Sequence, residues 1–376
     1  MPSKNKVIFA AAGAGKTYGI CKQTMSNLNT SSKKILLVTY TNKGVESLAN
    51  EYRKQNFGVI DERVDIKTWY QFLLSEMIKP YQNFILGQGN IVRSIDFTSM
   101  YGKPNFKKRG TKEHYLNRHN DVLVNAASEL AVDCNTASEG KVVERLSKVY
   151  SHIYIDEIQD FVGVDLDLLN LIFGSSTHVT CVGDYKQATF RTHNAKKNKK
   201  TTGTNIIEHF NNLEKQSQVA ITFHTKSRRF NQDICNFSNS IFPDGNEIET
   251  IMSETSDGDG VYLITACEMS KYISHYNPVV LKYDSKTTTF GYDSYNFGVC
   301  KGMTLERVLI FPNKPFLSFI KDGKSLSSPS KYYVASTRAR YSMAFVVDKL
   351  FETDCFKFSE IEINGEKIKV SKYTKL

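Results

Sequence analysis

The sequence contains no cysteines spaced as CxxC and no long apolar run. Its 7 cysteines are scattered, so neither a zinc cage nor a disulfide framework is indicated. No signal peptide is recognised either, and these absences predict a protein of the reducing cytoplasm without a membrane-spanning segment. No repeat at the periods of solenoids or propellers is visible, which argues against those architectures.

The composition is that of a globular protein, with 40% hydrophobic and 23% charged residues. A chain of 376 residues is long enough for two domains of ordinary size. The net charge of +10 favours a polyanionic partner, although a basic protein with no such partner is the alternative. Basic residues concentrate between Lys107 and His119 and between Arg191 and Lys200, and either stretch is equally compatible with a solvated loop.

Short apolar runs alternate with helical patterns along the chain, which predicts an α/β protein with mostly parallel sheets flanked by helices. The strands expected in the first half are Val7–Ala11, Ile35–Thr39, Asp65–Thr68, Ile153–Asp156 and His178–Gly183. The strands expected in the second half are Gln218–Thr222, Val261–Thr265, Pro278–Lys282, Arg307–Phe311 and Tyr341–Val347. The helices expected between them include Lys16–Leu28, Lys43–Gln55 and Asn231–Ile241.

A change in composition suggests where the two domains meet. Lys196–Thr204 is rich in Lys, Asn, Thr and Gly, so we expect domains at about residues 1–200 and 201–376. The polar and basic stretch Pro80–His119 lies inside a segment, about 77–150, that we expect to be a small insertion in the first domain.

The segment AAAGAGKT, Ala10–Thr17, directly follows an expected strand and opens an expected helix. Glycines let backbone N–H groups wrap a phosphate, and the helix N-terminus adds its positive dipole end. The residues expected to bind the nucleotide are Gly13, Ala14, Gly15, Lys16 and Thr17. Lys16 would reach the β- and γ-phosphates and Thr17 would bind Mg²⁺. The strict pattern has glycine where this chain has Ala10, and a glycine-rich turn without a ligand is the alternative.

The segment IDEIQD, Ile155–Asp160, supplies the complementary acids at the end of another apolar strand. Asp156 would bind Mg²⁺ or lie next to its ligands, and Glu157 would orient or deprotonate the attacking water. A solvated acidic turn is the alternative, but it explains four polar residues in this order poorly.

These two segments resemble motifs I and II of UvrD-like superfamily 1 helicases, the UvrD/Rep/PcrA branch, whose second motif reads DExQD. The other motifs follow in the family order at Thr39–Gly44 (Ia), Thr68–Phe72 (Ib), Val182–Gln187 (III), Arg229 (IV), Lys301–Thr304 (V) and Tyr333–Arg340 (VI). The resemblance spans residues 7–347 and implies two RecA-like P-loop lobes with the nucleotide in the cleft between them.

The resemblance also implies roles for individual residues. It implies that the catalytic residues are Glu157, Gln187, Arg229 and Arg338. It also implies that Arg228 and Gly302 contact the nucleotide. Contacts with the nucleic-acid strand fall on Thr41, Asn42, Lys43, Thr68, Trp69, Tyr70, Phe190 and Arg191. ATP and Mg²⁺ are the implied cofactors. Arginines of the second lobe would stabilise charge on the transferring phosphoryl group when the cleft closes.

Several departures from the family pattern limit what the resemblance implies. The first expected strand begins at Val7, which leaves no room for the glutamine motif that reads adenine. Arg228 takes the place of the aromatic residue that stacks on the base, and Thr304 that of a glutamate. Thr192 stands where the family has an aromatic that stacks on the strand. The large 2B insertion cannot fit between Arg229 and Lys301. Compact members of this type occur in phages, mobile elements and antiphage systems.

We therefore expect an ATP-dependent DNA helicase or single-stranded DNA translocase moving 3′ to 5′, with RNA as an alternative strand. A second hypothesis is an NTPase regulatory subunit that a nucleic acid or a protein partner stimulates without unwinding. A small-molecule kinase with the same P-loop would not need Arg229 and Arg338.

Overall fold

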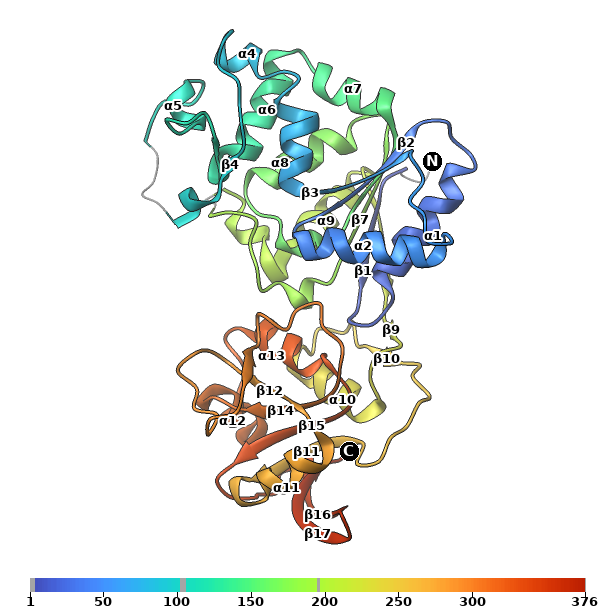
Figure 1. Ribbon diagram of the computed structural model, residues 1–376, viewed down its shortest axis with the longest axis vertical. Coiled ribbons are helices and arrows are strands. Elements are labelled where there is room, and N and C mark those ends of the chain that lie inside the picture. The colour runs from blue at the N-terminus through green and yellow to red at the C-terminus, as the bar shows by residue number, and fades with distance from the viewer. Residues whose placement is uncertain (1–3, 102–105, 195–196, 376) are drawn as a thin grey trace. The chain divides into compact units, whose positions relative to one another are not determined.

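The computed structural model describes residues 4–101, 106–194 and 197–375 (Figure 1). The chain divides into two compact units. Unit 1 comprises Met1–Ala10, Gly15–Tyr185 and Phe190–Phe223, and unit 2 comprises Ala11–Ala14, Lys186–Thr189 and His224–Leu376.

The sheet of unit 1 has the strand order β3–β2–β6–β7–β1–β8. Its strands are β1 (Lys6–Ala10), β2 (Lys34–Thr39), β3 (Val64–Thr68), β6 (Tyr150–Ile155), β7 (His178–Gly183) and β8 (Ala220–His224). The pairs from β3 through β1 are parallel. Because the carboxyl ends of parallel strands share one edge, the segments that follow β1, β6 and β7 emerge side by side.

The helices of unit 1 cover both faces of this sheet (Figure 1). They are α1 (Lys16–Leu28), α2 (Asn42–Gln55), α3 (Trp69–Phe72), α4 (Asn83–Leu86), α5 (Lys112–Tyr115), α6 (Ala127–Ala137), α7 (Lys141–Val149), α8 (Val164–Phe173) and α9 (Ile206–Lys215). A π-helix, η1 (Leu73–Ile78), continues α3, and the short strands β4 (Ile95–Asp96) and β5 (Val122–Leu123) pair separately.

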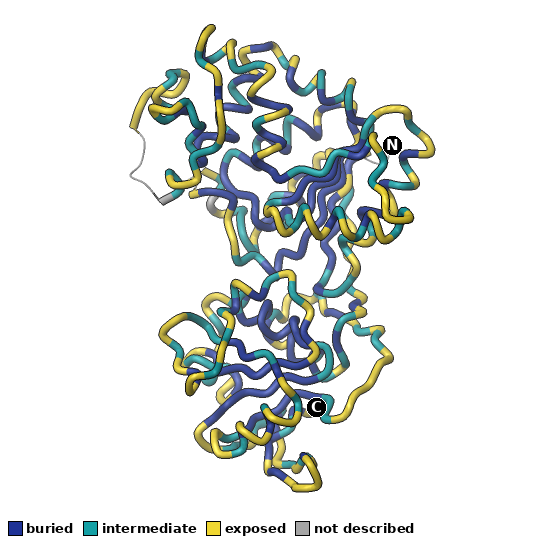
Figure 2. Tube along the Cα trace, viewed as in Figure 1, coloured by how far each residue is buried: buried dark blue, intermediate teal, exposed yellow. Residues whose placement is uncertain are grey.

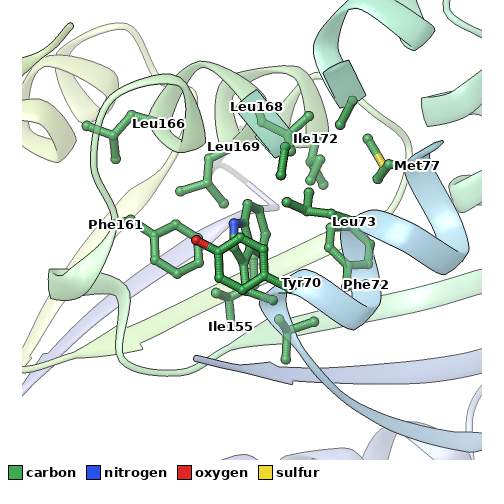
Figure 3. Packing of buried hydrophobic residues seen from close by; sticks show 14 of the residues in the cluster. Tyr70, Phe72, Leu73, Met77, Ile155, Phe161, Leu166, Leu168, Leu169 and Ile172 are labelled. Carbon is green, nitrogen blue, oxygen red and sulfur yellow. The ribbon is translucent and has the colours of Figure 1, made fainter. Parts of the chain in front are cut away.

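Side chains of β2 alternate between the two faces, as a strand requires. Leu36 and Val38 join the core cluster beneath α6 and α8, while the equally buried Leu37 points to the opposite face. Figure 3 shows part of the first cluster, where Tyr70 and Phe161 pack against Ile155 and Leu169. Figure 2 shows the resulting pattern, with buried residues along the strands and exposed ones on the outer helix surfaces.

The sheet of unit 2 has the order β13–β12–β14–β15–β11–β17–β16. Its strands are β11 (Gly260–Thr265), β12 (Val279–Lys282), β13 (Ser294–Asn296), β14 (Leu305–Phe311), β15 (Ala339–Val347), β16 (Phe356–Ile363) and β17 (Glu366–Tyr373). Pairing is parallel except where β17 meets β11 and β16. A separate short pair joins β9 (Lys226–Ser227) to β10 (Glu249–Thr250).

Two hydrophobic clusters cover the two faces of this second sheet. Val261 and Leu263 of β11 belong to one cluster, and the alternating Tyr262 and Ile264 belong to the other. The helices are α10 (Gln232–Ile241), α11 (Ala266–Tyr276), α12 (Lys314–Asp322) and α13 (Pro329–Ser336). α10, α12 and α13 contribute to the first cluster, and α11 contributes to the second.

The expected α/β class with mostly parallel sheets is confirmed, as are the expected strands and the helices at Lys16–Leu28, Lys43–Gln55 and Asn231–Ile241, to within a few residues. The passage from unit 1 to unit 2 lies at Phe223–His224, beyond the boundary expected at residues 200 and 201. The difference arises because α9 packs Phe210 into the core of unit 1 and β8 lies beside β1 in its sheet.

The segment expected as an insertion, residues 77–150, has two parts. Its final helices α6 and α7 bury Leu130, Cys134 and Leu146 in the core of unit 1, so they are integral to that unit. Between Pro80 and His119 the described residues form only short elements. Within the described ranges, no helix combines the length and apolarity needed to cross a bilayer.

Candidate active site

The loop between β1 and α1 uses glycine where only glycine fits. Gly13 and Gly15 have φ of +77° and +78°, in the left-handed region. A Cβ on Gly13 would lie 2.4 Å from Ser227 Oγ and 2.5 Å from Arg229 Cβ, all within unit 2. Gly15 is the N-cap of α1 and offers no side chain to the helix end. The first turn of α1 therefore presents backbone N–H groups that have no partner within the helix, which favours an anion.

Lys16 and Thr17, the first two residues of α1, are half-buried. The Nζ of Lys16 donates a hydrogen bond to the carbonyl oxygen of Ala10 at 3.1 Å, so the side chain folds back over the loop. Ala14 N–H donates to Ala11 O at 3.1 Å and closes the turn. The expected phosphate-binding residues are thus gathered in one strand–loop–helix segment.

Asp156 and Glu157 follow directly on β6. Asp156 is 7% exposed, and its N–H donates to Val38 O at 2.8 Å, extending the pairing with β2. Glu157 has φ 58° and ψ 38°, a left-handed conformation that is uncommon for a side chain of this size. Its N–H donates to Asp156 Oδ1 at 2.9 Å, so the carboxylate of Asp156 is held against the backbone of Glu157.

The side chain of Gln159 connects Glu157 to the end of β7. Its Nε2 donates to Glu157 Oε2, and its Oε1 accepts from the N–H of Asp184 at 3.0 Å. Gly183 leaves room for this amide, since a Cβ there would lie 2.4 Å from Gln159 Oε1. The register pairs Phe9 of β1 with Gly183. β7 thus lies between the acidic turn after β6 and the strand that leads into the glycine loop.

Arg338 in unit 2 is 1% exposed and makes several hydrogen bonds to backbone and neutral side-chain oxygens. Its Nη2 donates to Gln187 Oε1 at 3.1 Å, and its Nη1 donates to Met303 O at 3.1 Å. Arg229 Nη1 donates to Thr337 O at 3.1 Å, next to Arg338. The segment of Gln187 is held in unit 2 because the buried Lys186 forms an ion pair of 2.8 Å with Asp244. Gln187, Arg229 and Arg338 therefore gather in unit 2.

Arg228 and Gly302 lie on the surface of unit 2. The backbone N–H of Arg228 donates to Gly13 O at 3.0 Å, so the main chain of this exposed residue lies beside the glycine loop. Gly302 has φ +87° and lies in the turn before Met303, whose carbonyl accepts from Arg338.

The residues expected to contact a strand fall into an exposed and a buried group. Thr41, Asn42, Lys43, Phe190 and Arg191 are exposed. Thr41 caps α2 by accepting from Gly44 N–H at 3.0 Å, and Phe190 is 43% exposed. These five side chains are accessible to a ligand.

Thr68, Trp69 and Tyr70 are buried, at 8%, 0% and 5% exposure. Thr68 and Gln71 form a capping box at the start of α3. The hydroxyl of Tyr70 donates to Thr192 O, and the indole of Trp69 packs against Phe161 with ring centroids 4.5 Å apart. In this conformation the two rings are packed in the core of unit 1, and neither ring is exposed for stacking on a base.

Sequence reasoning missed Asp165, a fully buried carboxylate at the start of α8. It accepts from Trp69 Nε1 at 3.1 Å and from the hydroxyls of Ser128 and Thr192. His193 Nδ1 lies 3.4 Å away. The helical spacing could have revealed it. Residue 165 shares a helix face with Leu168, Leu169 and Ile172, so an apolar residue is expected there and an aspartate is conspicuous.

The charge of Asp165 is retained despite its burial. Burial opposes ionisation, but the charge of His193 and hydrogen bonds from His193, Ser128 and Thr192 outweigh it, so the pKa of Asp165 lies below its ordinary value. Burial likewise opposes the charge of His193, and Asp165 outweighs it and raises the pKa of His193. Each of the two buried groups therefore favours the charged form of the other.

Comparison with known proteins gives one family and a set of similar structures. The AAA domain family matches residues 1–191. Similar solved structures include Arterivirus nonstructural protein 10 (helicase) in complex with DNA, at 14% identity and a TM-score of 0.47, covering 91% of this chain and 60% of that one. A crystal structure of Arterivirus nonstructural protein 10 (helicase) has 15% identity and a TM-score of 0.47, and covers 91% of this chain and 59% of that one. This chain thus spans at most 60% of their length. No curated protein matches it.

Proposed function

Because the chain belongs to the AAA domain family, we propose that it is a nucleoside triphosphatase that couples ATP hydrolysis to movement along single-stranded DNA. The observation that carries the proposal is the fixed carboxylate of Glu157, held by Gln159 at the end of β6, two strands away from the glycine loop. A carboxylate held near a phosphate-binding loop is suited to orient an attacking water.

In this proposal Lys16 binds the β- and γ-phosphates, and Gly13, Ala14 and Gly15 cradle them with backbone N–H groups. Thr17 and Asp156 provide the hard oxygen ligands that Mg²⁺ prefers. Mg²⁺ in such sites is held mainly by substrate phosphates and water, with only one or two protein side chains. The described residues fit this requirement, since Asp156 follows β6 and Thr17 follows β1, and both strands belong to the same sheet.

Gln187, Arg229 and Arg338 are proposed to act on the γ-phosphate. The hydrogen bond from Arg338 to Gln187 supports this proposal, because it brings the two side chains together in unit 2. Guanidinium groups stabilise the charge that develops on the transferring phosphoryl group. Arg228 and Gly302 are proposed to contact the rest of the nucleotide, as the resemblance to superfamily 1 motors implies.

The exposed side chains at the carboxyl edge of the unit 1 sheet are proposed to contact the strand. Lys43 supplies charge for phosphates, and Phe190 and Arg191 supply an aromatic face and a guanidinium for bases. The resemblance to UvrD-like superfamily 1 motors favours 3′-to-5′ movement.

A second candidate function is a partner-dependent NTPase that does not unwind. The burial of Trp69 and Tyr70, together with Thr192 in place of an aromatic, favours it because stacking is worth about 1–3 kcal/mol per base. The affinity for single-stranded DNA would then be low, and a partner protein would stimulate ATP hydrolysis.

The test is steady-state ATP hydrolysis by the purified chain, with and without single-stranded DNA, beside the Lys16→Ala variant. Stimulation by the strand that Lys16→Ala abolishes would support a nucleic-acid motor. Hydrolysis indifferent to the strand would favour the regulatory subunit. Turnover retained by Lys16→Ala would contradict the nucleotide site itself.

A further inference from the structure

The carboxylate of Asp165 lies among hydrogen-bond donors from several separate segments of unit 1. Oδ1 accepts from Trp69 Nε1 and Ser128 Oγ, and Oδ2 accepts from Thr192 Oγ1 and, at 3.4 Å, from the N–H of Val162. His193 Nδ1 lies 3.4 Å from Oδ2. An indole N–H and a backbone N–H can only donate, so this environment requires an acceptor on both oxygens.

Thr192, one of these donors, is fixed at each of its polar groups. Its N–H donates to Asp160 O at 2.9 Å, and its carbonyl accepts from the hydroxyls of Tyr70 and, at 3.3 Å, Tyr40. Its own hydroxyl donates to Asp165. The two residues immediately before it, Phe190 and Arg191, are exposed. Two exposed side chains therefore directly precede a residue whose polar groups are all hydrogen-bonded within unit 1.

We propose that Asp165 is a positioning residue for strand binding, which holds Thr192 so that Phe190 and Arg191 present a preformed contact to single-stranded nucleic acid. This role rests on the proposed function. It also assigns Trp69 and Tyr70 to the support of that contact, since Trp69 donates to the same carboxylate and Tyr70 to the same threonine. Preformed contacts bind better because less side-chain and loop entropy is lost on binding.

The substitution Asp165→Asn tests this role with little change in volume. Its NH₂ group would face either Trp69 Nε1 or the N–H of Val162, and a donor against a donor-only group cannot form a hydrogen bond. It also removes the charge that pairs with His193. We expect a Kd for a fluorescent oligothymidylate about tenfold higher than in wild type, the loss of roughly one stacking contact. Basal ATP hydrolysis without the strand should stay within about twofold in kcat and KM.

Hydrogen exchange gives a readout of positioning that does not depend on the strand. Peptides covering residues 188–194 should exchange faster in Asp165→Asn, and peptides of α1 should not. The matched control is Glu76→Gln, another buried carboxylate of unit 1, which pairs with Lys67 and Arg145 and is 5% exposed. It should leave the Kd for the strand and the exchange of residues 188–194 unchanged.

If Asp165→Asn fails to fold, a pair of variants at Thr192 tests the positioning role of Asp165 instead. Thr192→Val removes only the hydroxyl that Asp165 accepts from, and Thr192→Ser restores it. Strand affinity lost in Thr192→Val and recovered in Thr192→Ser supports the role of Asp165. Equal affinity in both variants overturns it.

The outcomes separate this role from the proposed function. A wild-type chain that hydrolyses ATP and binds the strand, with Asp165→Asn binding equally well, overturns the role of Asp165 alone. Strand affinity and basal hydrolysis reduced alike in Asp165→Asn and Glu76→Gln also overturn it, because the effect is then general destabilisation. A wild-type chain that binds no strand overturns both.

Discussion

Gln159 donates its side-chain N–H to the carboxylate of Glu157. The same amide accepts from the backbone N–H of Asp184, so the carboxylate is tied to the ends of both β6 and β7. Because Glu157 also has a left-handed backbone, its direction is set by the main chain as well as by this contact. A group oriented this firmly is suited to act on one bound water.

Glu157→Gln should reduce kcat for ATP hydrolysis by about 10²–10⁴-fold, the usual contribution of a general base. ATP binding, followed with a fluorescent analogue, should change little because the shape of the side chain is kept. Glu144→Gln is the control, since Glu144 is exposed on α7 and forms an ion pair with Lys148 on the same helix. A kcat near that of wild type in Glu157→Gln would remove Glu157 from the chemistry.

Arg338→Ala should reduce kcat by about 10³-fold or more, as expected for an arginine that stabilises transferring phosphoryl charge. ATP affinity should fall much less. Arg338→Lys keeps the charge but loses the geometry that reaches Gln187, Met303 and Val334 together, so it should remain slow. The control is Arg340→Ala, which removes an arginine two residues on that pairs with Glu254 at the surface. Equal losses of binding and kcat in Arg338→Ala would count against a role confined to the transition state.

The sequence predicts most strands and the phosphate-binding loop because their signals are local. Apolar runs followed by glycine or by adjacent acids identify β1 and β6 together with the residues after them. Asp156 and Glu157 could be placed near the loop because parallel strands end at a common edge. Fold and candidate nucleotide site therefore follow from short segments and one rule of sheet topology.

The burial of Trp69 and Tyr70 could not be predicted in this way, because an aromatic side chain in a motif suits stacking and core packing equally. The contacts that decide it are distant in sequence, 96 residues for Trp69 with Asp165 and 122 for Tyr70 with Thr192. The extent of unit 1 also depended on α9, whose Phe210 contacts Phe9 of β1 with ring centroids 6.0 Å apart. Local patterns carry no information about such pairings.

Gly13→Ala should impair ATP hydrolysis severely, because the new Cβ would clash with Ser227 and Arg229 and the left-handed φ disfavours alanine. Gly19→Ala is the matched control, since nothing lies within 4 Å of a Cβ at that helical position. It should keep hydrolysis and raise the free energy of unfolding by about 0.5–1 kcal/mol. Urea titrations and ATPase assays on both variants check this, and normal turnover in Gly13→Ala would contradict the close packing of the loop.

His152 should make the stability of unit 1 depend on pH. Its half-buried ring stacks on His178 with centroids 4.9 Å apart, and burial, then the charges of His178 and Lys6, lower the pKa of His152 from 6.5 to about 4. As the pH falls from 6.5 towards 4, the unfolded chain takes up a proton that the folded chain does not, so the free energy of unfolding decreases. His152→Gln removes this proton uptake, so the free energy of unfolding should depend less on pH between 6.5 and 4. The single tryptophan, Trp69, is in the core of unit 1, so its fluorescence in urea reports the unfolding of this unit. If the free energy of unfolding changes with pH equally in wild type and His152→Gln, the pKa of His152 is not lowered by folding. An NMR titration of the His152 ring measures this pKa directly.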